Sequence, residues 1–237
     1  MNPPFQINSE ILSLCTAIAQ SIGKCEGLHL TSPKPQLRKQ NRIKTIQATL
    51  GIEGNTLSLD QVTAILEGKR VLGPTKDIAE VKNAITAYEN ILNYNPYSLN
   101  SFLSAHKTLM QKIMEDSGKF RNANVGVLQG TKLAHVAPKH TMVNQLMENL
   151  FDFIKNDKDT HILIKSCVFH YETEFIHPFT DGNGRMGRLW QTVLLGNEYP
   201  IFEFIPIESV IKNNQKEYYD VLGICDKEGE STKFIIF

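Results

Sequence analysis

The stretch "HPFTDGNGRMGRLWQ", residues 177–191, decides how this chain is expected to fold and what it can bind. Pro178 disfavours helix at the residue before it, so a helix that precedes the stretch should end at His177. Gly182 and Gly184 allow backbone conformations that are closed to other residues. A second helix is expected to start near Gly184. The stretch therefore predicts a helix, a glycine-containing loop and another helix.

The same stretch carries the residue types of a phosphate site. Turned backbone N–H groups and a helix N-terminus attract an anion, and Arg185 and Arg188, three residues apart on one helix face, suit a chain of phosphates. Asp181 offers a hard oxygen ligand for Mg²⁺. His177, with an ordinary pKa of roughly 6.5, can take a proton from a hydroxyl. The combination favours phosphoryl or nucleotidyl transfer over a plain turn with two surface arginines.

The composition limits the class of protein. The chain has 237 residues, 41% of them hydrophobic, which fits one large domain or a core with a helical extension. Its 25 basic residues balance 25 acidic ones, which argues against coating nucleic acid or an anionic membrane. There is no signal-peptide pattern and no apolar stretch near the roughly 20 residues of a membrane span. The four cysteines form no CxxC pair and indicate a reduced, cytoplasmic protein.

Apolar residues recur at helical spacing along most of the chain and predict an all-α, mainly helical fold. Helices are expected over 9–23, 43–55, 58–68, 77–94, 98–114, 140–156, 161–175, 184–197 and 207–225. The segment 161–175 is apolar nearly all round, which is typical of a buried central helix. Alternation over 123–138, around Gly130, predicts a short β-hairpin. The final "STKFIIF" should pack into the core, unless the natural protein continues beyond it.

Residues 177–188 resemble a known family. They match the Fic signature H-x-F-x-[D/E]-G-N-G-R-x-x-R at every fixed position. The preceding "HYETEF" also resembles that family, although Thr173 stands where an aromatic residue is more usual. The resemblance extends to "EVKNAITAYE", to the hairpin region and to "KEYYDVL". It implies a Fic fold, a helical bundle with one β-hairpin flap near the active site, where the flap would hold a target segment by strand addition.

The resemblance also implies an activity. The usual reaction of the family moves AMP from ATP to a hydroxyl side chain of a protein, which makes this chain a candidate protein adenylyltransferase with Mg²⁺ as cofactor. His177 would deprotonate the target Ser, Thr or Tyr. Phe179 would anchor the loop in the core, and Asp181 would hold Mg²⁺ against the α- and β-phosphates. Some family members transfer other groups, so AMP is the expected cargo.

The remaining motif residues would bind the nucleotide. By resemblance, Gly182, Asn183 and Gly184 form the anion nest, Arg185 contacts phosphate and Arg188 reaches the γ-phosphate. Negative charge develops on phosphate oxygens during transfer, and fixed donors together with a metal ion stabilise it.

A second motif, "TLGIEGN" at residues 49–55, lies far from the first. Glu53 is an acid in a last helical turn, where the helix dipole disfavours it, so it invites a partner. The stretch resembles the Fic inhibitory motif [S/T]-x-x-x-E-[G/N] of the subclass whose inhibitory helix is N-terminal. By that resemblance Glu53 pairs with Arg188 and inhibits the enzyme in cis. Some members use the same glutamate to remove AMP, so de-AMPylation stays an alternative.

Two regions and two classes of function follow. Residues 1–95 are expected to form an N-terminal helical region with the inhibitory motif, and residues 96–237 the Fic core. The expected partners are ATP and a protein hydroxyl, which could belong to the chain itself. No nucleic acid or membrane is expected for this portion, and an oligomer is compatible with the sequence. The rival is a nucleotide-binding regulatory module of a larger DNA-binding regulator, which would not need the base His177.

Other polar residues are assigned supporting roles. His170 and Glu174 lie one turn apart and could suggest a metal site. Their helix looks buried and no HExxH pattern is present, so His170 is expected to be a hydrogen-bonded core residue. Arg121, His135 and His140 are expected at the surface or behind the site, not as catalysts.

Overall fold

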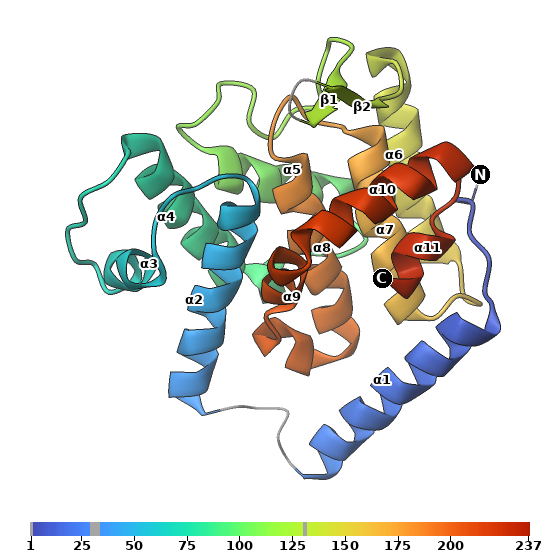
Figure 1. Ribbon diagram of the computed structural model, residues 1–237, viewed down its shortest axis with the longest axis horizontal. Helices are drawn as coiled ribbons and strands as arrows, with labels where there is room; N and C mark the ends of the chain where they lie inside the picture. The colour runs from blue at the N-terminus through green and yellow to red at the C-terminus, as the bar shows by residue number, and fades with distance from the viewer. Residues whose placement is uncertain (1, 29–33, 130–131) are drawn as a thin grey trace.

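The computed structural model describes residues 2–28, 34–129 and 132–237, and these residues form a helical protein with one two-stranded sheet (Figure 1). This confirms the predicted fold class. The helices are α1 (Ser9–Gly27), α2 (Pro35–Ile52), α3 (Leu59–Leu66), α4 (Thr75–Glu89), α5 (Leu99–Met110), α6 (His140–Asn156), α7 (Ile162–Ile176), α8 (Asn183–Glu198), α9 (Ile207–Asn213), α10 (Gln215–Glu228) and α11 (Thr232–Ile236), with 3₁₀ turns η1 (Ile91–Asn93) and η2 (Pro200–Phe204). None of these described helices is both long enough and apolar enough to cross a membrane.

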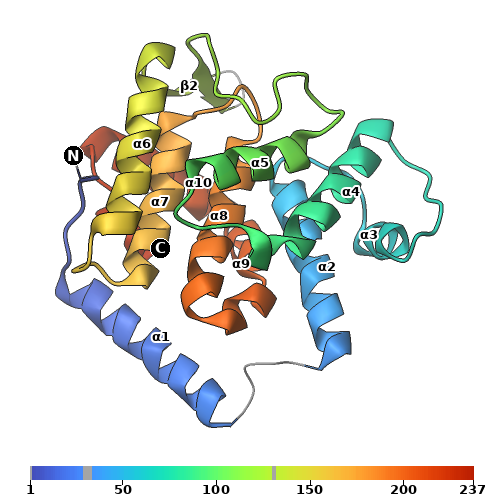
Figure 2. The same cartoon turned by 180° about the vertical axis from the view of Figure 1, so that it is seen from behind.

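Helices α7 and α8 form the centre of the molecule (Figures 1 and 2). Every residue of α8 from Arg185 to Gly196 is buried, and α7 is buried on nearly all sides, as its sequence predicted. Trp190 in α8 is fully buried and meets the rings of Phe102 and Phe151 edge-on. Because this pair is surrounded by other helices, the loop that joins α7 to α8 has a rigid support.

The N-terminal helices pack on the same core. The main hydrophobic cluster joins Ile46 of α2 and Val81 of α4 to Phe102 of α5 and Leu189 of α8. The turn after α2 leads into α3, which begins with the predicted cap at Ser58. This packing brings the last turn of α2 to the start of α8. The boundary at residues 95 and 96 stays a prediction.

Several helix bounds differ from the expected ones. Helix α2 begins at Pro35 and not at residue 43, α1 continues to Gly27, and the helix expected to reach residue 94 ends at Glu89. The helix expected over 98–114 ends at Met110, and Lys112 takes a left-handed conformation with φ 62°. The helix expected over 207–225 is two helices, α9 and α10, that meet at Asn214. The Asn214 side chain donates to the Val210 carbonyl at 2.9 Å, a local bond that competes with helix continuation. Apolar spacing continues through this break, which is why periodicity missed it.

The predicted hairpin is present as β1 (Gly126–Gln129) and β2 (Lys132–Val136), paired antiparallel with Gly126 opposite Val136. Gly130 lies outside the described residues. Beyond the turn, His135 of β2 contacts the Phe175 carbonyl at the end of α7, with 2.7 Å between Nε2 and the oxygen. The hairpin is therefore fastened beside the α7–α8 loop, where a flap is expected.

The two ends of the chain pack together. The Ser231 amide donates to the Pro4 carbonyl at 3.0 Å, and the Gln6 amide donates to Thr232 Oγ1 at 2.8 Å. Phe234 of α11 is 4% exposed and lies in an apolar cluster with Tyr218. The final apolar run therefore packs into the core in part: Phe234 is buried, Ile235 and Ile236 are partly buried, and Phe237 is 38% exposed.

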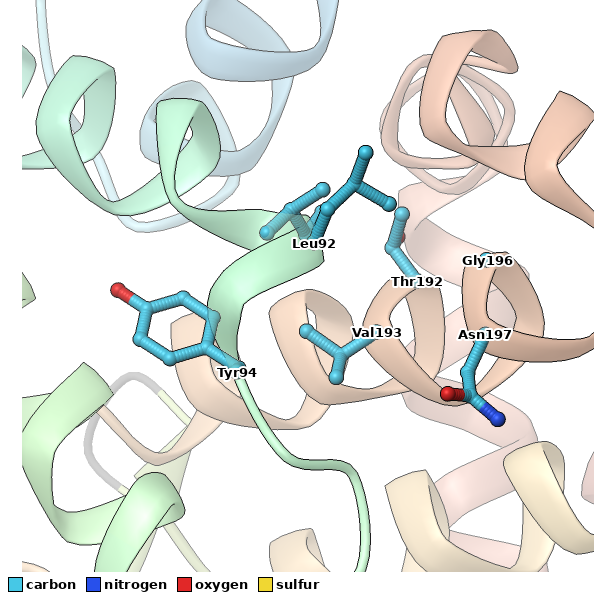
Figure 3. A pocket seen from close by; sticks show the side chains of 7 residues that line it. Leu92, Tyr94, Thr192, Val193, Gly196 and Asn197 are labelled. Carbon is cyan, nitrogen blue, oxygen red and sulfur yellow. The ribbon is translucent and has the colours of Figure 1, made fainter.

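Two cavities lie away from the α7–α8 loop. One cavity, of about 860 Å³, lies between α1 and the segment from α7 to α11, and its lining is mostly apolar. The other, about 190 Å³, lies between η1 and the C-terminal half of α8 (Figure 3). It is lined by Ile91, Leu92, Tyr94, Thr192, Val193, Gly196 and Asn197. Neither is lined by a residue of the 177–188 motif, so the predicted site is separate from both.

Candidate active site

The α7–α8 loop begins and ends in left-handed backbone. His177, the C-cap of α7, has φ 50° and ψ 58°, and Gly182, the N-cap of α8, has φ 88°. Glycine adopts this region freely, whereas a residue with a Cβ carries a cost of roughly 1–2 kcal/mol there. Helix α7 thus ends at His177, its C-cap, as the presence of Pro178 in the sequence predicted. Backbone strain at a non-glycine residue often accompanies function, and here it falls on the predicted base.

The loop is anchored from inside by two motif residues. Phe179 is fully buried, and its ring stacks on His106 with centroids 3.6 Å apart. Asn183 brackets the Phe179 backbone, accepting from its N–H at 2.8 Å and donating to its carbonyl at 2.9 Å. Phe179 therefore anchors the loop as expected. The Asn183 side chain is used for loop geometry, which leaves only its backbone N–H for an anion.

Arg121 holds the loop from outside. Its guanidinium donates to the carbonyls of His177 at 2.7 Å, Ala123 at 2.8 Å and Pro138 at 2.5 Å. The backbone N–H of Arg121 donates to the Pro178 carbonyl at 2.9 Å. Arg121 is 4% exposed, so of the two expected positions, at the surface or behind the site, it takes the second. It supports the loop from behind, because a guanidinium fixed by several carbonyls has a defined orientation.

His106 fixes the middle of the loop. Its Nδ1 accepts from the Gly118 N–H at 2.8 Å, so its Nε2 carries the proton and donates to the Asp181 carbonyl at 3.0 Å. Burial lowers the pKa of His106 to about 4, against an opposing effect of Asp181. The ring is therefore neutral near pH 7 in the tautomer that both bonds require.

His177 has the chemistry of a base. Its half-buried imidazole lies with Nδ1 3.4 Å from the Glu174 carbonyl, an acceptor, so the lone pair is on Nε2. Burial is the main cause that lowers its pKa below the ordinary value, and His135 and Arg121 act in the same direction. The imidazole is therefore neutral near pH 7 and able to accept a proton at Nε2.

The start of α8 has the polarity of an anion site. Gly182 provides no side-chain cap, and the first turn contains no acidic residue. The first N–H groups of a helix have no intrahelical acceptor and carry partial positive charge. They can therefore bind a phosphate. Gly184 is helical, so the expectation that it needs unusual backbone freedom is wrong.

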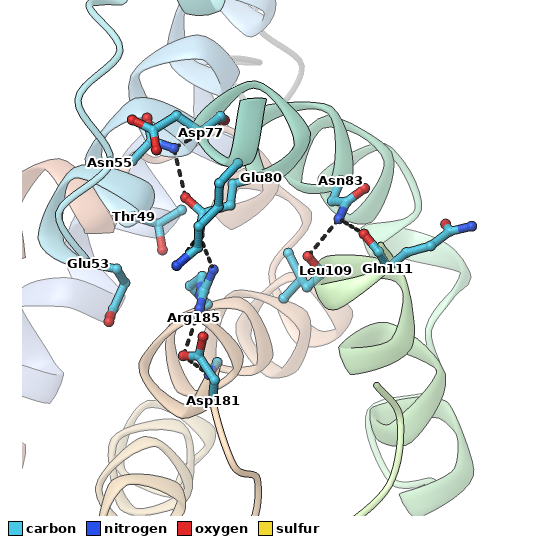
Figure 4. Close-up of polar contacts among 12 residues, drawn as sticks. Thr49, Glu53, Asn55, Asp77, Glu80, Asn83, Leu109, Gln111, Asp181 and Arg185 are labelled. Carbon is cyan, nitrogen blue, oxygen red and sulfur yellow. Dashed lines mark hydrogen bonds and ion pairs between the residues drawn. The ribbon is translucent and has the colours of Figure 1, made fainter. Parts of the chain in front are cut away.

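Arg185 and Asp181 form one side of the site (Figure 4). Arg185 Nη1 donates to Glu80 Oε1 at 3.1 Å, and Nη2 donates to Asp181 Oδ1 at 2.9 Å. Glu80 also accepts from Asn55 Nδ2 at 2.8 Å, which ties α8 and α4 to the turn after α2. Burial alone would raise the pKa of Asp181, but Arg185 and the Gly182 N–H lower it overall, so the carboxylate is charged.

Asp181 fits the predicted Mg²⁺ ligand. Its side chain is 50% exposed, and both Arg185 and the Gly182 N–H contact the same oxygen, Oδ1. Oδ2 therefore remains for a hard cation, which would complete its shell with water and phosphate oxygens. The described residues contain no cluster of three or more His, Cys, Asp or Glu that could hold a metal without substrate.

Arg188 is turned toward α2. It is 2% exposed, and its Nη2 lies 2.5 Å from Glu53 Oε1. Its Nε donates to Thr49 Oγ1 at 2.9 Å, and Nη2 donates to the Thr49 carbonyl at 3.2 Å. The ion pair expected between Glu53 and Arg188 is thus present, and Thr49 and Glu53 of the second motif both contact this guanidinium. Arg185 and Arg188 share a helix but have different partners.

The supporting histidines differ from the base. His170 is fully buried, with Nδ1 2.8 Å from Gln191 Oε1 and Nε2 3.1 Å from the Tyr218 hydroxyl, and burial lowers its pKa to about 3. It is the core residue that was expected. His135 contacts Asp226 at 2.8 Å and the end of α7, so it supports the hairpin. His140 contacts Asn124 and no motif residue.

Sequence reasoning missed Glu80 and His106 as site residues and gave no partner for Arg121, which it expected at the surface or behind the site. They contact Arg185, Asp181 and His177 across separations of 105, 75 and 56 residues. No local spacing joins them to the motif. Only the packing of α4, α5 and the loop after α5 on the central helix pair places them.

Comparisons with known proteins agree with this architecture. The model of the Fic/DOC family matches residues 96–195. A crystal structure of a Fic family protein from Desulfovibrio desulfuricans G20 is 44% identical and superposes with a TM-score of 0.95, over all of this chain and 73% of that one. The chain therefore belongs to the Fic/DOC family. A Fic domain containing signaling protein from Bacteroides thetaiotaomicron, 24% identical with a TM-score of 0.71, shares the fold.

Curated relatives carry a functional name. "Protein adenylyltransferase Fic" from Aedes aegypti is 32% identical over 212 residues, 84% of this chain and 40% of the relative. "Protein adenylyltransferase fic-1" from Caenorhabditis elegans is 29% identical over 191 residues, 75% of this chain and 35% of the relative. The chain thus spans 40% or less of the length of these two proteins.

Proposed function

We propose that this chain is a protein adenylyltransferase that moves AMP from ATP to a Ser, Thr or Tyr hydroxyl of a protein, with Mg²⁺ bound at Asp181. The observation that carries the proposal is the α7–α8 loop, which joins a neutral imidazole to the uncapped N-terminus of α8. Nucleotide binding alone needs no base. The names of the curated relatives support the same reaction.

The proposed chemistry assigns one task to each group. His177 Nε2 accepts the hydroxyl proton as the hydroxyl oxygen forms a bond to the α-phosphorus. The bond from that phosphorus to the bridging oxygen breaks, and pyrophosphate leaves. The first N–H groups of α8 and Arg185 hold the phosphate oxygens, on which charge develops. Mg²⁺, when bound, would neutralise charge on the α- and β-phosphates.

We also propose that Glu53 inhibits the chain in cis. Its carboxylate, with Thr49, satisfies the guanidinium of Arg188. A γ-phosphate that needs the same guanidinium would meet a carboxylate in its place. ATP would then bind in an unproductive position until Glu53 moves away.

The experiment compares wild type with Glu53→Gly, each incubated with ATP labelled at the α- or the γ-phosphate and with a cell lysate. We expect α-label on protein, at least about tenfold more with Glu53→Gly, because a competition that costs about 1.4 kcal/mol changes a binding constant tenfold. γ-Label on protein would indicate a kinase. Neither label with Glu53→Gly would favour the nucleotide-binding regulatory role. Equal α-label in both proteins would contradict the inhibition.

A further inference from the structure

A second carboxylate, Glu174 from α7, lies near the guanidinium of Arg188 without forming an ion pair with it. A Cβ placed on Gly184 would lie 2.5 Å from Glu53 Oε1, 3.0 Å from Arg188 Nη1 and 3.2 Å from Glu174 Oε1. Those three groups therefore surround one point at the mouth of α8, and a Cβ at this point would require at least the Glu53 side chain to shift. Glu53 approaches Arg188 from α2, and Glu174 approaches from α7. The hydrogen bonds of Arg188 to side chains and backbone all go to α2, at Thr49 and Glu53.

Glu174 is held in place by the core. Its Oε1 accepts from the Tyr218 hydroxyl of α10 at 3.1 Å, and His170 Nε2 of its own helix lies 3.9 Å away. Its side chain is 17% exposed. Burial raises its pKa to about 7, Glu53 acts in the same direction, and Arg188 opposes them. Near neutral pH the carboxyl therefore exists in both charge states.

We propose that Glu174 is a second carboxylate that competes with an incoming phosphate for Arg188, and that its protonated form releases the guanidinium. The proposal rests on the proposed ATP site and deepens its regulation. Removal of Glu53 alone would leave a competitor that acts only when it is ionised. A variant without Glu53 is then most open at low pH, where Glu174 is protonated, and partly closed at high pH, where Glu174 is ionised.

The sign follows from the charges that face Glu174. With Glu53 removed, Arg188 is the charged group that remains, because Tyr218 and buried His170 are neutral, and it favours ionised Glu174. A phosphate that arrives beside Arg188 restores a negative charge and favours the protonated form. Nucleotide binding is therefore coupled to proton uptake at Glu174. By linkage, affinity falls as pH rises through the interval between the two pKa values of Glu174, without and with nucleotide.

The test measures the Kd of Mg·ATP by calorimetry from about pH 5 to about pH 8.5, because the loss of Glu53 lowers the pKa of Glu174 below its value in the wild type. It compares Glu53→Gly with Glu53→Gly/Glu174→Gln, in which the amide imitates the neutral acid and can keep the Tyr218 bond. We expect similar Kd values at the acid end and binding about tenfold weaker for Glu53→Gly at the alkaline end, since one pH unit beyond a pKa changes a linked constant by up to tenfold. ATP and His177 titrate in the same way in both proteins, so their effect on the Kd cancels in the comparison.

The matched control is Glu53→Gly/Glu172→Gln. Glu172 is on the same helix, and burial also raises its pKa to about 7, with no charged partner among the causes. This control should follow Glu53→Gly at every pH. In addition, Glu53→Gly alone should take up a fraction of a proton on binding near neutral pH, beyond that of the double variant. Calorimetry in two buffers of different ionisation enthalpy measures this uptake.

Several results would overturn the proposal. A Kd ratio that does not change with pH would show that Glu174 does not compete. Weaker binding by the double variant at every pH would show that Glu174 holds Arg188 in its working position instead. Absence of ATP binding to every variant would remove the site itself. Binding without transfer of α-label would refute the adenylyltransferase proposal and leave the proton coupling to be judged by the Kd values.

Discussion

His177 combines strained backbone, partial burial and a single ring contact to a carbonyl. Burial keeps the imidazole neutral near pH 7, and the Glu174 carbonyl directs the proton to Nδ1. These features suit a base whose Nε2 must carry no proton when the target hydroxyl arrives. They are properties of one residue, and one substitution tests them.

In a Glu53→Gly background, His177→Ala should lower the rate of AMP transfer by about 10²-fold or more, because a general base contributes about that much. The Kd for Mg·ATP should stay within about twofold, since the N–H groups of α8 and the two arginines are unchanged. Calorimetry and α-label incorporation measure the two quantities separately. Transfer at the parent rate would place the base elsewhere.

Arg121 stabilises the conformation of the α7–α8 loop through its bonds to the His177 and Pro178 carbonyls. Arg121→Met should lower the free energy of unfolding by roughly 3 kcal/mol, because it leaves buried carbonyls without a donor. Urea unfolding measures the change. Lys119→Met, an exposed neighbour in the same segment, is the control and should change stability by less than about 0.5 kcal/mol. Equal effects of the two substitutions would show that the carbonyl clamp does not matter.

At the scale of elements, the last turn of α2 decides what Arg188 contacts. Asn55 fastens this turn to α4, with Nδ2 2.8 Å from Glu80 Oε2 and 3.2 Å from the Asp77 carbonyl. Figure 4 shows Asn55 and Glu80 joined above Arg185. The last turn of α2 and Arg185 are therefore coupled through Glu80.

Asn55→Ala should loosen the last turn of α2 and give AMP transfer between that of wild type and that of Glu53→Gly. The control is Asn83→Ala, because Asn83 also joins α4 to neighbouring carbonyls, those of Leu109 at 3.0 Å and Gln111 at 2.7 Å, without contact to α2. Both substitutions should cost about 1 kcal/mol of stability, but only Asn55→Ala should raise transfer. Equal transfer in the two variants would separate Asn55 from inhibition.

At the scale of the molecule, the N-terminal helices and the family core share one hydrophobic cluster. Ile46 and Val81 belong to the first 95 residues, and Phe102 and Trp190 to the remainder. Trp190 is the single tryptophan of the chain, and its Nε1 donates to the Pro96 carbonyl at 3.1 Å. The expected boundary between residues 95 and 96 thus lies against the centre of the core.

Unfolding in urea should therefore be one cooperative transition. Trp190 fluorescence and far-ultraviolet circular dichroism should give the same midpoint, because removal of the N-terminal helices would expose the shared cluster. The measurement also tests the predicted division at residues 95 and 96. Two separate transitions would show that the regions fold independently.

The sequence by itself determined what local chemistry controls. Period-3.6 apolar spacing predicted the helices, Pro178 predicted the end of α7, and the 177–188 motif predicted the base, the metal ligand and the anion site. The pairing of Glu53 with Arg188 came from resemblance and is present in the structure. The break at Asn214 was not predicted, because a local side-chain bond interrupts the helix while the apolar pattern continues through it.

Only the tertiary structure decided which distant groups meet. Glu80, His106 and Arg121 reach the loop from segments whose apolar faces pack on α7 and α8, and no sequence separation encodes that approach. A side chain at position 184 would meet Glu53, Arg188 and Glu174. This convergence becomes visible only when α2, α7 and α8 are in place. The physical reason is that spacing acts over a few residues, whereas burial and charge act through space between helices far apart in the chain.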